Sequence, residues 1–93
     1  MESIPVYLER INQILNNFKQ KGCATVTTAD IIRQYSGGFF SNRDVSPVFS
    51  FNAQFGKLLK RNMRNLGISE ARSNVPINDD QGHPTCTSEW KLL

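Results

Sequence analysis

Four basic side chains lie close together in the middle of the sequence, at spacings that would bring them onto one side of a helix. They are Lys57, Lys60, Arg61 and Arg64. No acidic residue occurs between Asp44 and Glu70, although exposed helix faces usually mix signs because opposite charges three or four residues apart stabilise a helix. Grouped cations without acidic neighbours are suited to binding phosphate, so this stretch is a candidate nucleic-acid interface.

Short polar side chains precede these cations. When a helix lies in the major groove of DNA, its N-terminal half comes nearest to the base edges. Ser50, Asn52 and Gln54 fall in that half, with Gln54 at the margin of the exposed face, and amide side chains can pair with adenine. The alternative is an ordinary solvated helix face, whose last two cations are favoured by the helix dipole.

The other reactive side chains do not assemble into a site along the sequence. His83 and Cys86 are three residues apart, but two ligands do not complete a tetrahedral zinc site. Asp79 and Asp80 are not followed by the further ligands of a cation-binding loop, and Cys23 has no base near it in the sequence. We therefore expect no enzyme activity, no metal and no cofactor.

Size and composition predict one folded domain over residues 1–93, since 39% of the residues are apolar. The net charge of +3 permits contact with phosphate without requiring it. No apolar run approaches the ~18 residues of a membrane span, and the N-terminus lacks a secretory pattern, so we expect a cytoplasmic protein. Cys23 and Cys86 are then expected to be free, buried or half-buried thiols; a bridge between them remains the alternative if the chain is exported.

The first half of the chain predicts two helices joined by a short extended segment. Apolar residues three and four positions apart predict a helix over 5–21, with Ser3 as its cap and Gly22 as its end. A β-branched segment over 24–26 is too short for more than one brief strand.

The second helix has clear local signals at both ends. Thr27 and Asp30 have the spacing of a capping box, and Gly37 is a suitable C-terminal residue. The side chains expected to face the core are Ile31, Ile32 and Tyr35.

A third helix is predicted over about 47–66, with a start between Ser46 and Phe51 and an end at Gly67. Gly56 in its middle costs roughly 1 kcal/mol relative to Ala. A close approach by another helix or by a nucleic-acid backbone would account for this glycine, and we favour helix packing. The apolar side of the helix consists of Phe51, Phe55, Leu58, Leu59, Met63 and Leu66, with Asn62 as a polar member.

The last part of the chain predicts a β-hairpin, with strands over 69–77 and 85–92 and a polar turn over 78–84. Asp79 and Asp80 in this turn would repel a phosphate backbone. In the second strand one set of side chains is expected to face one way and the alternate set the other. The first set is Cys86, Ser88, Trp90 and Leu92; the second is Thr85, Thr87, Glu89 and Lys91.

Taken in order, these elements predict an α+β fold of the winged-helix type, with three helices, a short strand and a C-terminal hairpin as the wing. The stretch NAQFGKLLKRNMRNLGI with the hairpin after it resembles small winged-helix domains at the C-terminal ends of phage and poxvirus-type primase-helicases. The matching residues are Phe55, Gly56, Leu59, Leu66, Gly67 and Ile68. They cover about a fifth of the chain and concern the core and a helix end, so the resemblance implies a fold more than a function.

Two functional hypotheses remain open. In the first, the chain is a small DNA-binding regulator or accessory factor that places its third helix against duplex DNA, and a homodimer would gain affinity on a two-fold site. In the second, it is a non-catalytic protein-interaction module, such as one from a mobile element, whose basic face meets an acidic partner and whose hairpin edge pairs with another chain. The cations of the third helix favour the first hypothesis, and the acidic turn favours the second.

Overall fold

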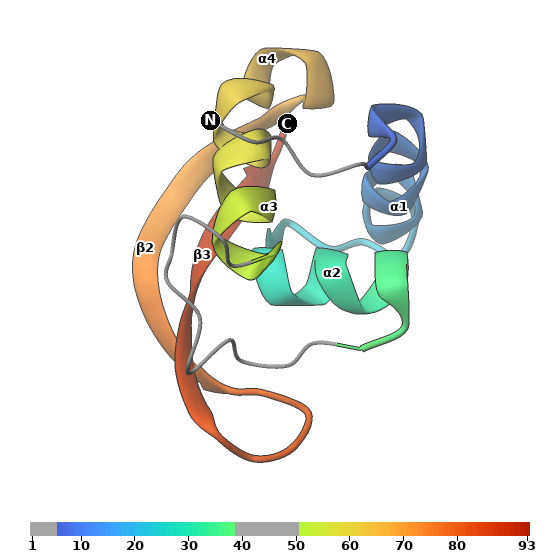
Figure 1. Ribbon diagram of the computed structural model, residues 1–93. Helices are drawn as coiled ribbons and strands as arrows, with labels where there is room; N and C mark the ends of the chain where they lie inside the picture. Colours follow the sequence, from blue (N-terminus) through green and yellow to red (C-terminus); the bar gives the residue numbers. More distant parts are fainter. Residues whose placement is uncertain (1–5, 39–50) are drawn as a thin grey trace.

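The structure, a computed structural model of the chain, describes residues 6–38 and 51–93. In chain order its elements are α1 (Leu8–Gln20), β1 (Thr25–Thr27), α2 (Thr28–Ser36), α3 (Phe51–Arg61), α4 (Met63–Leu66), β2 (Ile68–Asn78) and β3 (Pro84–Leu92). Helices α1, α2 and α3 lie on one side of the hairpin formed by β2 and β3 (Figure 1). The predicted α+β class is confirmed. None of the described helices combines the length and the apolar character needed to cross a membrane.

The three strands form one antiparallel sheet in the order β1-β3-β2. Val26 of β1 pairs with Trp90 of β3, and Ile68 at the start of β2 pairs with Leu92 at the end of β3. Directly opposed residues share a face of a sheet, and Val26, Ile68 and Trp90 are all buried. This face of the sheet therefore contributes to the core, and the terminal hairpin closes the fold against the helices.

Strand β2 lies at an edge of the sheet and is irregular. Its register with β3 shifts twice between Glu70 and Val75. Asn74 lies in this stretch with φ of 55°, a left-handed conformation that Asn tolerates better than most residues. Pro76 follows it and has no N–H to donate. Bulges and proline are the features by which edge strands avoid pairing with other chains, so much of this edge is protected.

Helix α1 begins later than predicted. Its first residue is Leu8, and Tyr7 before it is extended, with its N–H donating to the hydroxyl of Tyr35 in α2 at 3.0 Å. This tertiary bond sets the start of the helix, and the predicted cap Ser3 lies outside the described residues. The end was predicted correctly, since Gly22 follows the helix with φ of 85°.

Helix α2 has both predicted ends. The Thr27 hydroxyl accepts from the Asp30 N–H at 3.1 Å, and the Asp30 carboxylate accepts from the Thr27 N–H at 3.2 Å. This is a complete capping box, which satisfies two backbone donors that a helix start leaves without partners. At the other end Gly37 adopts the left-handed conformation with φ of 89°.

Strand β3 holds the start of α2 through two side chains. The Ala29 N–H donates to the hydroxyl of Thr87 at 3.1 Å, and the Trp90 indole N–H donates to the hydroxyl of Thr28 at 2.8 Å. Thr87 and Trp90 are both buried, although strict alternation predicted that they face opposite sides. Helix α2 covers Thr87, and the buried Thr87 hydroxyl has a hydrogen-bond partner in the Ala29 N–H.

Apolar residues from every layer meet in one core. The Tyr35 and Phe55 rings contact edge to face at a centroid distance of 5.8 Å, which connects α2 to α3. On the other side of Tyr35, the Arg10 guanidinium of α1 stacks on the ring at 4.5 Å. The buried apolar residues are Ile11, Ile14, Leu15, Val26, Ala29, Ile31, Ile32, Phe55, Leu59, Leu66, Ile68 and Trp90.

The single third helix predicted over 47–66 is two helices. α3 ends at Arg61 and α4 begins at Met63, with Asn62 between them at φ of −114° and ψ of 20°. The Asn62 side-chain amide donates to the Leu58 carbonyl at 2.8 Å, a local bond that competes with the backbone ladder and bends the helix. The predicted end at Gly67 is correct, and the predicted cap and proline at Ser46 and Pro47 lie outside the described residues.

Candidate nucleic-acid interface

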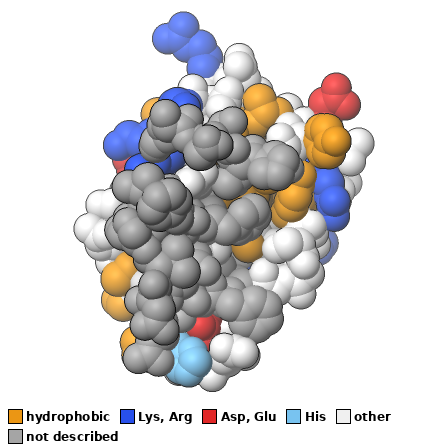
Figure 2. Space-filling model, in the orientation of Figure 1, with side chains coloured by type: hydrophobic (Ala, Val, Ile, Leu, Met, Phe, Trp, Pro, Cys, Tyr) orange, Lys and Arg blue, Asp and Glu red, His pale blue; other side chains and the backbone are white. Residues whose placement is uncertain are grey.

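The four predicted cations are all exposed side chains of α3 and α4. We call them the basic surface: Lys57, Lys60, Arg61 and Arg64. Figure 2 shows Lys and Arg side chains gathered at the top and upper left of the molecule, near α3 and α4. Because the helix bends at Asn62, Arg64 belongs to α4, and the cations follow a bend instead of one straight helix.

One acidic side chain contacts the basic surface. Glu70 of β2 lies 3.7 Å from the Lys60 ammonium, whose side chain stays 65% exposed. An ion pair at this exposure is worth roughly 0–1 kcal/mol, so Lys60 can exchange it for a phosphate at little cost. In the described part of the chain the other three cations form no ion pair, which leaves the surface positive.

The short polar residues predicted to approach base edges are not together at the surface. Gln54 is buried at 7% exposure beside Phe55, so its predicted place at the margin of the exposed face is wrong. Asn52 is half-buried, and Ser50 lies outside the described residues. The described part of the interface therefore consists mainly of cations. Such side chains mostly contact phosphates, and phosphate contacts do not distinguish one base from another.

Packing against the described helices does not explain Gly56, contrary to our prediction. A Cβ built on Gly56 would meet no described atom within 4 Å. The residue is half-buried and lies four positions before Lys60, hence on the same side of α3. The helix thus bears the cost of a central glycine without a packing contact among the described residues that requires one.

The hairpin tip is not a free acidic patch. The Asp79 side chain is buried, and its Oδ1 accepts from the N–H groups of Gln81 and His83 at 2.9 and 2.8 Å. The Asp80 carboxylate accepts from Nε of Arg33 in α2 at 2.8 Å. One carboxylate therefore shapes the turn and the other ties it to α2. The tip lies at the opposite end of the molecule from α4 (Figure 1).

The fold adds a cation that the sequence did not indicate. The ammonium of Lys19, at the end of α1, lies 3.6 Å from the position of a Cβ built on Gly67, which ends α4. Lys19 and Gly67 are 48 positions apart in the sequence, so the sequence does not show that they lie close together. Only the packing of α1 against α4 brings them together.

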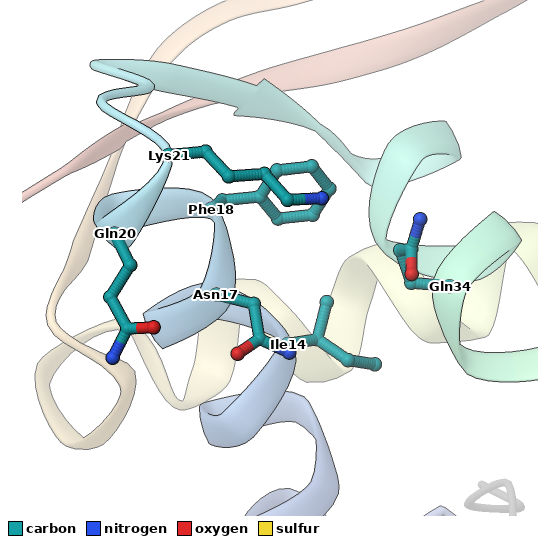
Figure 3. A pocket seen from close by; sticks show the side chains of 6 residues that line it. All are labelled: Ile14, Asn17, Phe18, Gln20, Lys21 and Gln34. Carbon is teal, nitrogen blue, oxygen red and sulfur yellow. The ribbon is translucent and has the colours of Figure 1, made fainter.

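A small pocket opens between α1 and α2 (Figure 3). The Lys21 ammonium lies over the Phe18 ring at 5.9 Å, and the two side chains run alongside each other. The volume of about 190 Å³ is below the roughly 300 Å³ at which ligand pockets usually begin. The lining consists of Ile14, Asn17, Phe18, Gln20, Lys21 and Gln34, of which only Phe18 and Ile14 are not exposed. It is a poor fit for a cofactor.

The two cysteines, Cys23 and Cys86, do not form a disulfide with each other. Cys23 is half-buried and Cys86 is exposed, which corrects the prediction that both would be at least partly buried, and each is free. Among the described residues no group of three or more His, Cys, Asp or Glu side chains could hold a metal ion.

Comparison with known proteins finds no family model, no curated protein and no solved structure that matches this chain.

Proposed function

We propose that this chain is a small winged-helix protein that binds duplex DNA through α3 and α4, as a regulator or an accessory factor. The order of its elements and the sheet order β1-β3-β2 support the fold, since a short strand after the first helix pairs with the last strand of a terminal hairpin. The hairpin β2–β3 would be the wing.

The observation that carries the proposal is the basic surface. Four exposed cations lie along α3 and α4, and Glu70 is the one acidic side chain paired with any of them in the described ranges. Mutual repulsion of these cations is relieved when phosphates bind to them, and the counterions that this binding releases from the DNA favour the complex.

Gly56 is a second support. A mid-helix glycine that no described residue packs against is expected where a ligand backbone approaches closely, and Gly56 lies on the side of Lys60. A phosphate backbone passing over this position would have room that a side chain would occupy.

The two features that favoured the alternative, a protein-interaction module, were the acidic turn and the hairpin edge, and both are weaker in the structure than in the sequence. The tip that would keep a wing away from DNA has one carboxylate buried in the turn and the other bonded to Arg33. The edge of β2, proposed to pair with another chain, is interrupted by two register shifts and Pro76. What remains for this alternative is an acidic partner for the basic surface.

The test is binding of mixed-sequence duplex DNA, followed by fluorescence anisotropy from ~50 to ~300 mM salt. Four phosphate contacts predict a log–log salt slope of about −3 to −4 for the native chain, and most of this slope should vanish when all four cations are changed to Gln. A matched pair of single variants separates location from net charge: Arg64→Gln should weaken binding, whereas Lys21→Gln should leave it nearly unchanged.

The hairpin offers a gain-of-binding comparison. Glu70→Gln releases Lys60 and should tighten binding a few-fold, while Glu89→Gln, which releases Arg72 from an equivalent pair at 2.9 Å, should not. Absence of binding at ~50 mM salt, where phosphate contacts are strongest, would reject DNA as the partner and leave the acidic protein partner.

A further inference from the structure

We propose that Lys19 of α1 is a fifth phosphate contact, and that the bound DNA backbone continues from α3 across the junction of α4 and α1. This inference depends on the proposed function. It adds a contact from a helix outside the basic surface, and it extends the interface away from the hairpin tip.

The end of α1 fixes the place of Lys19. The Gly22 N–H donates to the Lys19 carbonyl at 3.0 Å and the Cys23 N–H donates to the Phe18 carbonyl at 3.1 Å, the two bonds of a Schellman motif. This motif turns the chain sharply into β1. The last turn of α1 is thereby held beside the end of α4, where the Lys19 ammonium lies next to Gly67.

The end of α4 joins Lys19 to the basic surface. Gly67 follows Arg64 by three residues, and residues at this spacing are neighbours around one turn. Lys19 and Arg64 are both exposed, and neither forms an ion pair among the described residues. Two exposed cations near the end of one helix both add to the positive potential there, which attracts a phosphate.

Lys21 provides a natural contrast. It is exposed and lies in the same chain reversal, yet its ammonium points over the Phe18 ring, toward the pocket between α1 and α2 (Figure 3). Both lysines contribute equally to net charge, and both lie near the C-terminal end of α1, where cations are favoured. Only Lys19 lies at the junction with α4.

The experiment compares Lys19→Gln with Lys21→Gln in the same duplex-binding salt series. Loss of one phosphate contact should reduce the magnitude of the log–log slope by about 0.9 for Lys19→Gln and leave it unchanged for Lys21→Gln. Lys19→Arg keeps the charge and should restore the native slope. Thermal unfolding of each variant checks that the fold is intact, as expected for exposed side chains.

The outcomes separate this inference from the function on which it depends. If the native chain binds and the fourfold Gln variant loses most of its salt slope, but Lys19→Gln behaves like Lys21→Gln, the fifth contact is rejected and the proposed function stands. If the native chain does not bind duplex DNA, both are rejected.

Discussion

Asp79 and Asp80 are neighbours in the sequence with different roles in the structure. Asp79 is buried and accepts from two backbone N–H groups, while Asp80 is partly exposed and bonds to Arg33. From the sequence both were interpreted as charges that would repel phosphate. Their electrostatic effect is much smaller than that, because one is enclosed by its own turn and the other has a guanidinium beside it.

Asp79→Ala is therefore expected to destabilise the fold by about 1–3 kcal/mol, since it leaves two N–H groups of the tip without their acceptor. Asp80→Ala removes a partly exposed ion pair and should cost about 0–1 kcal/mol. Urea denaturation followed by Trp90 fluorescence measures both. Equal losses for the two variants would contradict the distinct roles assigned to these carboxylates.

At the scale of elements, the sequence predicted those helix ends that local signals determine. The capping box of Thr27 and Asp30 and the left-handed glycines Gly37 and Gly67 mark their helix ends in both sequence and structure. Such signals act within a few residues, so no knowledge of the fold is needed to interpret them.

The features that were mispredicted depend on contacts between elements. The start of α1 is set by a hydrogen bond to the hydroxyl of Tyr35 in α2, and Gln54 is buried by residues packed around α3. At the break between α3 and α4, the Asn62 side chain bonds locally to the Leu58 carbonyl. Asn also occurs within continuous helices, so an asparagine alone does not predict a break.

The two glycines of the third-helix region make a matched prediction. Gly67 has φ of 67°, so Gly67→Ala should destabilise the fold by about 1–2 kcal/mol, even though its Cβ would have only an ordinary contact with Lys19. Gly56→Ala should stabilise it by about 0.5–1 kcal/mol, because the site is helical and open.

Thermal and urea unfolding measure the two stabilities, and duplex binding gives Gly56 a second measurement. If a phosphate backbone passes over Gly56, Gly56→Ala weakens binding although it stabilises the protein. Binding unchanged in a stabilised Gly56→Ala variant would remove this glycine from the interface.

At the scale of the whole molecule, the basic surface and the hairpin tip are separated. α4 and the tip lie at opposite ends, and Lys19 extends the basic surface at the α4 end (Figure 1). In the proposed complex α3, α4 and the end of α1 make the described contacts, and the hairpin serves chiefly to close the core through Trp90 and Ile68. The sequence could supply the four cations of the basic surface, but their relation to Lys19 and to the tip required the fold.

This arrangement also predicts which form of DNA is preferred. Binding of single strands depends on exposed aromatic side chains for base stacking, worth about 1–3 kcal/mol per base. In the described ranges Tyr7 is the one aromatic residue among the exposed large hydrophobic residues, and it precedes α1, at the other end of that helix from Lys19. Because the described residues provide no stacking platform, we expect binding to depend on phosphate density, which is higher in a duplex.

With four contacts, the difference in counterion release alone should favour duplex over single-stranded DNA of the same length by roughly five- to tenfold at ~0.1 M salt. Anisotropy with matched labelled oligonucleotides measures this ratio. Trp90, the single tryptophan, is 1% exposed, so its fluorescence should not be quenched by stacking in either complex. Equal or tighter binding of the single strand would mean that aromatic residues stack on the bases. It would contradict an interface that depends on phosphate contacts alone.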